Sequence, residues 1–327
     1  MVRAGQCGNG CSISLTDTLG NNIFKKRHSP GRKYEFYREL FLSEYLATLD
    51  RDLTPRVIAC DPNLLEITFE GHQAISFNDN SAEEDYLDKV AWIHHLVREA
   101  RMPCTLYAKE ALVSSQELMI TLVDKTSSYL GTESKEKNEA SVYQRMHGLI
   151  RENFDLLDAV IDRLHFISPV SEAIFSHADF GLQNCVRNSN NELLIVDLEY
   201  SGMDSPVKQY FDCILHPRNS FGSRFTERWE ELFLKTLISR SDLPELATYG
   251  AAFALKWMFI VLNEFIPTIW ERRVFASEQR SRKKTDALII QLTKAQIYAR
   301  VARDLFKGND LVTGFTQSDR AQLKKSY

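Results

Sequence analysis

Short apolar runs alternate with turn-forming residues through the N-terminal part of the chain. The runs at residues 11–15 and 22–27 are bounded by glycine and asparagine, a pattern that predicts strands joined by turns. In residues 33–49 the apolar positions recur at steps of three and four, which predicts an amphipathic helix. Two further apolar runs within residues 55–71 are separated by the turn sequence DPN. This part of the chain therefore predicts strands, one helix and then strands.

The pattern changes to a helical period from residue 85 onward. Residues 86–100, residues 138–164 and most of the chain after residue 225 repeat apolar positions at helical spacing. The polar run at residues 124–141 is expected to be a loop or the frayed start of a helix. Residues 175–196 interrupt the helical pattern with short apolar runs that are typical of strands.

This change of pattern predicts two lobes. At 327 residues the chain is long enough for one large domain or for two lobes that each bury a core. We expect a small β-rich N-terminal lobe with one main helix, residues 1–72, and a larger, mostly helical C-terminal lobe, residues 73–327. The predicted fold class is therefore α+β.

One apolar segment, residues 250–270, is long enough to span a bilayer. It carries Lys256, Asn263, Glu264 and Pro267, which are costly in hydrocarbon. The segment is therefore interpreted as a buried amphipathic helix of a soluble domain, and no membrane partner is expected.

Composition is that of an ordinary soluble protein. Apolar residues make up 44% and charged residues 26%, and the net charge of -4 gives no sign of a polyanionic partner, so no nucleic acid is expected. The cysteines lie at irregular spacings and no basic and then apolar signal pattern opens the chain, which predicts a reduced, cytoplasmic location. Cys7 and Cys11 form one isolated C-x-x-x-C, a weak zinc signal. The acidic run at residues 79–88 is interpreted as a solvated face, and attraction of a cationic substrate is the alternative.

Two neighbouring segments, HADFGLQN and VDLEYSG, carry the residues with the clearest chemistry. The first presents Asp179 and Asn184 in a loop, and an apolar strand delivers Asp197 of the second next to them. One anionic and one neutral oxygen ligand, from Asp197 and Asn184, suit a Mg²⁺ ion that shares substrate phosphates. Asp179 is then free to act as the base toward a hydroxyl. The alternative is that these residues only form turns, in which Asp and Asn are favoured.

The order of these residues is the layout of kinase phosphoryl transfer, in which an H-x-D-x-x-x-x-N loop precedes a strand ending in a metal-binding aspartate. The segments resemble the aminoglycoside phosphotransferase and choline kinase-like family, whose loop typically reads HGDxxxxN and is followed by a strand and D-W-E or D-F-E. The chain departs from this pattern at Ala178, Gly181 and Leu198, none of which removes a ligand or the base. The resemblance implies a protein kinase-like two-lobed fold.

The resemblance also implies a lysine and glutamate pair in the N-terminal lobe. FKKRHSPG looks like the family's strand with a phosphate-contacting lysine, and YRELFLSEYL resembles the helix whose glutamate pairs with it; the residues implied are Lys26 and Glu39. Successive strand side chains point to opposite faces, so only one of Lys25 and Lys26 reaches a nucleotide. Lys25 remains the alternative to Lys26, and Glu35, one turn earlier on the helix, remains the alternative to Glu39. Taken alone, the basic residues would be read as a solvated hairpin.

Further fragments extend the match in the same order. LLEITFEG looks like the strand that links the lobes, MDSPVKQYFD is similar to the family's DPxxDLA segment, and GQCGNG is loosely like its nucleotide loop. These fragments and the catalytic loop imply Gly8, Gly10, Ile67 and Phe69 at the nucleotide, and His177 and Asp212 as residues that brace the loop.

The function implied by the resemblance is transfer of the γ-phosphate of ATP to a hydroxyl of a small molecule, with Mg²⁺ as the metal. The acceptor would be of the aminoglycoside, amino alcohol or sugar type. A protein acceptor is less favoured because no activation segment with an APE-like end is found. The alternative from another class is a catalytically silent, kinase-like nucleotide-binding protein, against which the intact Asp179, Asn184 and Asp197 argue.

Overall fold

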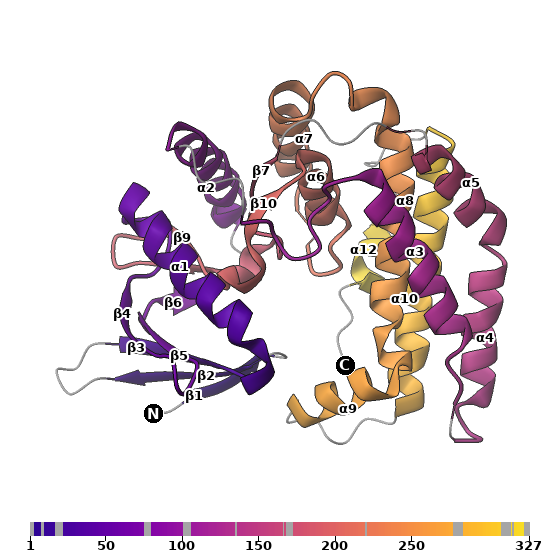
Figure 1. Cartoon of the computed structure of the whole chain (residues 1–327), viewed down its shortest axis with the longest axis horizontal. Helices are drawn as coiled ribbons and strands as arrows, with labels where there is room; N and C mark the ends of the chain where they lie inside the picture. Colours follow the sequence, from indigo (N-terminus) through magenta and orange to yellow (C-terminus); the bar gives the residue numbers. More distant parts are fainter. Residues whose placement is uncertain are drawn as a thin grey trace. The chain divides into compact units, whose positions relative to one another are not determined.

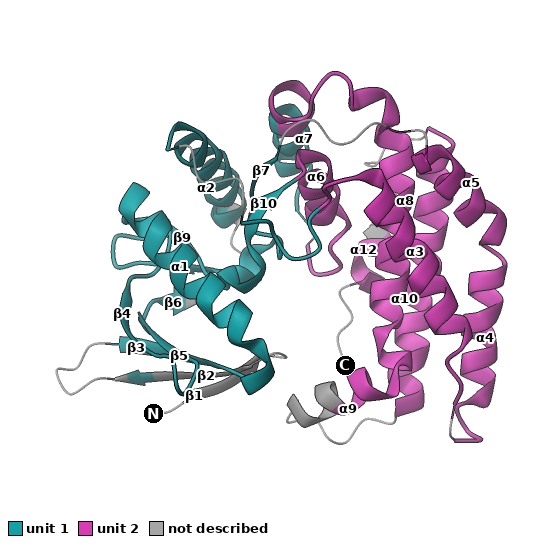
Figure 2. Cartoon of the chain, in the orientation of Figure 1, with its two compact units in different colours: residues 1–111, 173–204, 221–232 teal, residues 112–172, 205–220, 233–327 magenta. Residues whose placement is uncertain are grey.

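The protein, described by a computed structural model, forms two compact units (Figures 1 and 2). Unit 1 comprises residues 1–111, 173–204 and 221–232, and unit 2 comprises residues 112–172, 205–220 and 233–327. The residues that the structure describes are 3–7, 10–16, 22–74, 80–100, 106–134, 136–165, 167, 173–219, 221–276, 284–308, 315 and 317–323. Within these ranges, every strand belongs to unit 1.

Unit 1 begins with a five-stranded antiparallel sheet of order β1-β2-β3-β5-β4. Its strands are β1 (Arg3–Cys7), β2 (Gly10–Thr16), β3 (Asn22–His28), β4 (Val57–Asp61) and β5 (Glu66–Glu70). The apolar runs predicted β2 to β5 correctly. They did not predict β1, because its sequence RAGQC contains no β-branched or aromatic residue.

Helix α1 lies across one face of this sheet (Figure 1). It spans Lys33–Leu49, the range that the apolar spacing predicts, and follows the 3-10 turn η1 at Pro30–Arg32. Its buried face includes Phe36, Glu39 and Leu46. An acidic residue on the buried face of a helix requires a partner inside the protein, because an unpaired buried charge is costly.

The sheet face beneath α1 holds apolar core residues together with a lysine. The register of β3 with β5 places Phe24 opposite Phe69 and Lys26 opposite Ile67, so these side chains share one face. Ile67 and Phe69 pack with Phe36 of α1 in a core cluster. The role that the structure gives to Ile67 and Phe69 is therefore in the core, and contact with a nucleotide stays a prediction for both.

Short strands and turns form the central part of unit 1, as the interrupted pattern at residues 175–196 predicts. Three strands pair in the order β6-β8-β9, and β7 pairs with β10. The elements are β6 (Gln73–Ala74), α2 (Asn80–Glu99), β7 (Ile174–Ser176), η2 (Leu182–Asn184), β8 (Cys185–Arg187), β9 (Leu193–Ile195), η3 (Leu198–Tyr200), β10 (Gly202–Asp204) and α7 (Ser223–Leu232).

Unit 2 is built from helices, with α8 and α10 in extensive contact. Its α-helices are α3 (Ser115–Leu130), α4 (Ala140–Arg151), α5 (Phe154–His165), α6 (Pro206–Leu215), α8 (Leu246–Val261), α9 (Pro267–Ala276), α10 (Lys284–Phe306) and α12 (Gln317–Leu323). Shorter elements are the π-helical turn η4 (Phe233–Leu237) and the 3-10 turns η5 (Leu243–Glu245) and η6 (Leu262–Phe265).

The polar run at residues 124–141 only partly forms the expected loop. Its first seven residues, 124–130, continue helix α3, and the loop lies between α3 and α4. Buried side chains hold this end of the helix, since Tyr129 is 1% exposed and its hydroxyl donates to the backbone oxygen of Phe259 at 2.8 Å. The burial of Tyr129 therefore supports a helical end of α3 where the polar local sequence predicts a loop.

The long apolar segment of unit 2 is a core helix. The segment Leu243–Phe265 is long and apolar enough to cross a membrane, but 72% of its most apolar window is buried inside the protein. Lys256 and Glu264, the charged residues noted in the sequence, are among its buried positions. These observations support the interpretation of the segment as part of a folded core.

The two compact units differ in their limits from the predicted lobes. Unit 1 includes residues 73–111 and 173–204, which lie beyond the lobe boundary expected after residue 72. The predicted lobe boundary therefore stays a prediction. What the units make clear is that the segments HADFGLQN and VDLEYSG belong to the same compact body as α1 and the five-stranded sheet.

A close backbone approach in unit 1 gives a first prediction. A Cβ atom at Gly202 would lie 2.6 Å from the backbone oxygen of Leu106 and 2.6 Å from the backbone nitrogen of Ala108. We expect Gly202→Ala to lower the free energy of unfolding by about 1–3 kcal/mol, because backbone atoms cannot move aside cheaply. Urea denaturation followed by circular dichroism measures the change.

Gly148→Ala in helix α4 is the matched control. No heavy atom lies within 4 Å of the Cβ position at Gly148, so the added methyl group should raise stability by about 1 kcal/mol through helix propensity. Equal stability of Gly202→Ala and the unsubstituted protein would contradict the close approach.

Candidate active site

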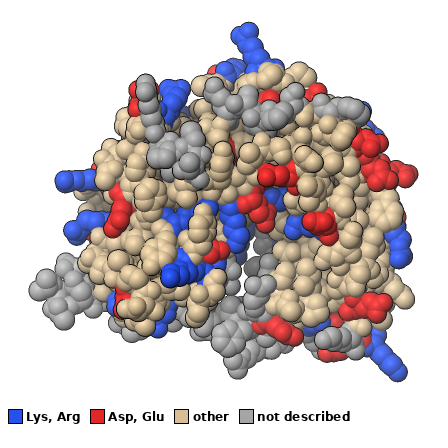
Figure 3. Space-filling view, viewed as in Figure 1, with Lys and Arg blue, Asp and Glu red and all other residues tan. Residues whose placement is uncertain are grey.

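Buried charges in unit 1 mark the candidate site. Charged side chains of both signs are spread over the face of the molecule shown in Figure 3. In contrast, Lys26, Glu39 and Glu199 are buried, at 7%, 2% and 3% exposure. Because a buried charge is tolerated only with partners, the contacts of these residues show which segments are held together.

Lys26 lies at the centre of this group. Its Nζ atom is 2.8 Å from a carboxylate oxygen of Glu39, 2.5 Å from Asp197 and 3.2 Å from Glu199. The three acids come from two segments, because Glu39 lies on α1 whereas Asp197 and Glu199 lie just after β9 and within η3. One ammonium group therefore ties the five-stranded sheet to α1 and to the segment VDLEYSG.

The alternative residues considered for this pair have other partners. Lys25 points to the opposite side of β3 and contacts Glu66 of the neighbouring strand at 3.1 Å. Glu35, one turn before Glu39, contacts Arg32 at 3.5 Å and Lys109 at 3.3 Å. Lys26 and Glu39 are thus the lysine and glutamate that the fold brings together, and their contact with phosphate stays a prediction.

The carboxylate form of Asp197 lies in an unfavourable electrostatic environment. Burial raises the pKa of Asp197 to about 6; Lys26 opposes this rise, and the neighbouring carboxylates of Glu39 and Glu199 add to it. Burial by itself would lower the pKa of Lys26, but the surrounding carboxylates raise it above its ordinary value. The environment of Asp197 therefore favours a further positive charge beside it.

Glu39 stays ionised in the same environment. Burial alone would raise the pKa of Glu39, but the charge of Lys26 and hydrogen bonds with His28 and Lys26 hold it below its ordinary value. Helix α1 consequently presents a fixed negative charge to the lysine of β3.

Helix α1 also holds the backbone that follows Asp197. The guanidinium of Arg38, next to Glu39 in sequence, donates to the backbone oxygen of Ser201 at 3.1 Å and to that of Tyr200 at 3.3 Å. Arg38 is 7% exposed, so these bonds are shielded from water. Two consecutive residues of α1 therefore position Lys26 and the segment after Asp197.

The loop HADFGLQN is anchored to this segment through His177. The Nε2 atom of His177 donates to the backbone oxygen of Val196 at 2.8 Å, and the hydroxyl of Ser201 donates to the backbone oxygen of His177 at 2.8 Å. Burial lowers the pKa of His177, which favours the neutral ring with a single donor proton. These contacts join the loop to the residue before Asp197, and the bracing of the loop by His177 stays a prediction.

Asn184 ends the loop just before β8, beside the residue that precedes Asp197. Its Nδ2 atom donates to the backbone oxygen of Asp179 at 2.8 Å, and its own backbone oxygen accepts from the nitrogen of Val196 at 2.9 Å. With its amide nitrogen engaged, the Oδ1 atom of Asn184 is the atom suited to a metal ion. A continuous set of contacts thus links Asp179, Asn184, Asp197 and Lys26.

Two residues around the loop adopt the left-handed backbone conformation. Ala178 has φ 66° and Asp197 has φ 65°. Ala178 stands at the glycine position of the HGDxxxxN motif that this loop resembles, and its positive φ is one that glycine adopts more readily than alanine. The loop therefore has, at residue 178, a backbone conformation that glycine would favour, although the residue is alanine.

Three further site residues were predicted, namely Gly8, Gly10 and Asp212. Gly8 lies outside the described residues, and Gly10 pairs in register with Cys7 of β1 and with His28 of β3. Asp212 belongs to unit 2, where it accepts from Trp257 at 3.2 Å and contacts Lys208 at 3.1 Å. Nucleotide contact by the glycines and bracing by Asp212 stay predictions.

Sequence reasoning missed Arg38, Glu199 and His28. Glu199 carried a signal, because it occupies the acidic position of the D-x-E motif quoted for the family. His28 lies two residues after Lys26, and this spacing places both on one face of β3. Arg38 had no comparable signal, since its partners are backbone oxygens more than a hundred and fifty residues later in the chain, at separations of 162 and 163.

A scan against protein-family models and a search of curated proteins both found no match. Solved structures do match. A choline/ethanolamine kinase family protein from Mesorhizobium loti superimposes with a TM-score of 0.53 at 13% identity, covering 99% of this chain and 92% of that protein. An ethanolamine kinase from Plasmodium vivax gives 0.53 at 11% identity, covering 93% and 83% respectively. The chain has the fold of these kinases.

An aminoglycoside phosphotransferase extends the comparison. A thermostable mutant of APH(4)-Ia, in ternary complex with AMP-PNP and hygromycin B, gives a TM-score of 0.52 at 14% identity and covers 89% of this chain and 94% of its own. The predicted α+β, two-lobed protein kinase-like fold is confirmed by these neighbours. At such identities the shared structure establishes the fold, and the acceptor has to be argued separately.

The network around Lys26 predicts a large stability effect. We expect Lys26→Met to lower the free energy of unfolding by about 3–5 kcal/mol, because Glu39 and Glu199 would remain buried without their shared ammonium group. Urea denaturation at neutral pH measures the loss.

Lys25→Met is the control on the opposite face of the same strand. The pair between Lys25 and Glu66 is partly exposed, so its loss should cost at most about 1 kcal/mol. Similar losses in the two variants would show that the face assignment of β3 is incorrect.

Proposed function

We propose that the protein is an ATP-dependent phosphotransferase that transfers the γ-phosphate to a hydroxyl group of a small molecule, with Mg²⁺ as the metal. The observation that carries the proposal is the contact of Lys26 with both Glu39 of α1 and Asp197 at the end of β9, within a fold shared with small-molecule kinases. A lysine held by a helix glutamate beside a metal-binding aspartate is the arrangement that kinases use on nucleotide phosphates.

The residues fit a magnesium ion by the chemistry of their donor atoms. Asp197 offers a carboxylate whose pKa is raised by burial, and Asn184 offers a neutral amide oxygen. Mg²⁺ prefers such oxygen ligands and retains positions for water and phosphate oxygens. When bound, the ion would neutralise charge on the transferring phosphoryl group. In this proposal Asp197 and Asn184 hold the metal.

The remaining roles follow from positioning and charge. Lys26, kept in place by Glu39, contacts the nucleotide phosphates and offsets their negative charge. Asp179 accepts the proton of the acceptor hydroxyl as the oxygen attacks the γ-phosphorus, and the leaving group is ADP. The hydrogen bond from Asn184 to the backbone of Asp179 sets the base beside the metal ligand. Phosphoryl transfer depends mainly on such orientation and electrostatic stabilisation.

A small-molecule acceptor is supported by what the structural neighbours act on or bind. Their descriptions name choline or ethanolamine kinase activity and a complex with hygromycin B. Amino alcohols, aminoglycosides and related hydroxylated compounds therefore form the first panel of acceptors for this chain.

The role of the base is tested with Asp179→Asn. ADP release is measured by a coupled assay with choline, ethanolamine, homoserine, aminoglycosides and common sugars as acceptors. We expect one acceptor class to stimulate ADP release in the unsubstituted protein, and Asp179→Asn to lower this rate by about 10²–10⁴-fold with nearly unchanged Mg-ATP binding. An undiminished rate in Asp179→Asn would refute the base, and nucleotide binding without turnover on any acceptor would favour the catalytically silent alternative.

The metal site is tested with Asp197→Asn by calorimetry with ATP, in the presence and absence of Mg²⁺. We expect Mg²⁺ to strengthen ATP binding in the unsubstituted protein, and this strengthening to be lost in Asp197→Asn, because a carboxylate ligand is replaced by a neutral amide. The control is Asp158→Asn, a change at an exposed position of α5 that should keep the full Mg²⁺ dependence. The assignment fails if Asp197→Asn binds Mg-ATP normally.

A further inference from the structure

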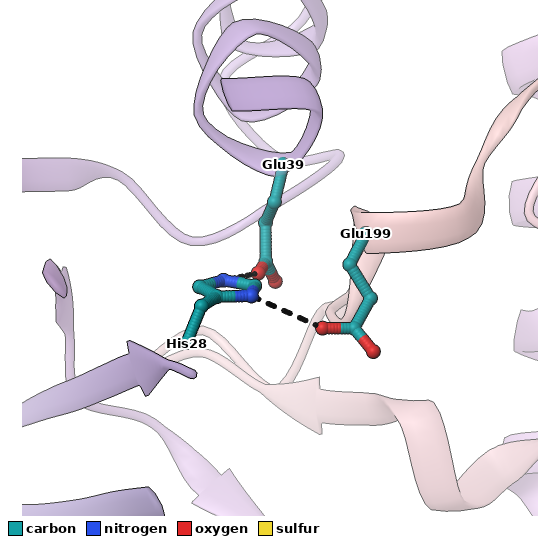
Figure 4. Close-up of side chains that lie close together, drawn as sticks. All are labelled: His28, Glu39 and Glu199. Atoms are coloured by element: carbon teal, nitrogen blue, oxygen red, sulfur yellow. Dashed lines mark hydrogen bonds and ion pairs between the residues drawn. The ribbon is translucent and has the colours of Figure 1, made fainter. Parts of the chain in front are cut away.

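A buried histidine lies between the two glutamates that surround Lys26. Figure 4 shows the ring of His28 between Glu39 and Glu199. Its Nε2 atom is 2.9 Å from Glu39 and its Nδ1 atom is 3.4 Å from Glu199, and its side chain is 0% exposed. The edge of the ring also faces Phe36 of α1, with ring centroids 5.9 Å apart. The imidazole therefore bridges α1 and η3 from inside the protein.

These three side chains have the residue types of a metal site, but their arrangement is different. Potential ligand atoms of His28, Glu39 and Glu199 lie within 4.8 Å of one another. The two ring nitrogens face different carboxylates, whereas a metal ion would have to share one point with a single ring nitrogen and both acids. In addition, Lys26 already contacts both glutamates at 2.8 and 3.2 Å. A cation of the protein itself therefore already pairs with both acids.

The two carboxylates determine which form of the ring fits. A neutral imidazole has one N–H donor, and its second nitrogen would direct a lone pair toward a carboxylate oxygen. A ring that carries a proton on both nitrogens donates to Glu39 and attracts Glu199. In this form neither ring nitrogen directs a lone pair toward a carboxylate. With this form the linked acids and cations match in number. Arg32 lies 3.1 Å from Glu199 and also contacts Glu35, which Lys109 contacts in turn, so Glu35, Glu39, Asp197 and Glu199 stand against Lys26, His28, Arg32 and Lys109.

We propose that His28 is a positioning residue of the phosphoryl-transfer site, which, as an imidazolium, ties Glu39 of α1 to Glu199 of η3. This inference rests on the proposed function. In the proposed function Lys26 also contacts nucleotide phosphates and Asp197 would hold a metal ion, so the two glutamates would share the charge of Lys26 with the phosphates. His28 and Arg32 then supply the positive charge that keeps the glutamates ionised and in place.

The protonation state is tested without nucleotide. Long-range ¹H–¹⁵N spectra of the ¹⁵N-labelled protein at pH 7 report the state of each ring nitrogen, and the His28 signals are assigned by their absence in His28→Gln. We expect both ring nitrogens of His28 to be protonated. The shift pattern of a neutral tautomer overturns the proposal, as does tight binding of Zn²⁺ to the unsubstituted protein that is lost in His28→Gln.

The positioning role is tested by calorimetry with Mg-ATP on folded His28→Gln at low temperature. Glutamine retains one hydrogen bond but carries no charge, so we expect the dissociation constant to rise about tenfold or more. His95→Gln is the control, because His95 is exposed on α2 and should bind as the unsubstituted protein does.

The possible failures of the calorimetry are distinct from one another. An unchanged dissociation constant in His28→Gln overturns the positioning role and leaves the proposed function standing. No binding of Mg-ATP by the unsubstituted protein overturns the proposed function and, with it, the role of His28 in that site, while the spectra still report the state of the ring.

Discussion

The structure of unit 1 depends on one buried ammonium group that is shared by several acids. Removing a lysine from water is costly unless carboxylates surround it, and the carboxylates are equally costly without the lysine. Lys26 therefore fixes the positions of Glu39 and Asp197, which lie 13 and 171 residues away in sequence. Because each partner belongs to a different element, the requirement for charge pairing orients α1 and the VDLEYSG segment on the sheet. The contacts that make the burial of these charges possible are also the contacts on which the proposed function depends.

Hydrogen bonds to the backbone extend this order to the loop that carries Asp179. His177 and Asn184 both bond to Val196, the residue before Asp197. Arg38 bonds to the backbone oxygens of Tyr200 and Ser201, three and four residues after Asp197. The oxygen atoms proposed to act on a phosphate are thus held before any ligand arrives. Preorganised charge costs no rearrangement during the reaction, which is why such a site suits phosphoryl transfer.

Much of the fold follows from local pattern, and the exceptions have tertiary causes. The limits of α1 and the presence of β2 to β5 are predictable because apolar spacing and turn residues act over a few neighbours. Strand β1 has no such pattern and exists because it pairs with β2. The end of α3 is polar in sequence but helical in structure, since Tyr129 is buried against α8. A pattern of apolar residues within one segment reveals neither its pairing with a neighbouring strand nor its burial against a distant helix.

By itself, the sequence determined the order of the elements and the residue types of the site. It placed Asp179, Asn184 and Asp197 at kinase spacing, and it put Lys25 and Lys26 on opposite faces of a strand. Only the tertiary structure decided which face is inward, because that depends on the pairing of β3 with β5 and on the side covered by α1. The same applies to His28 and Glu199, whose contact spans β3 and η3. Electrostatic attraction depends on distance in space, and the distance between residues far apart in sequence is set only when the chain has folded.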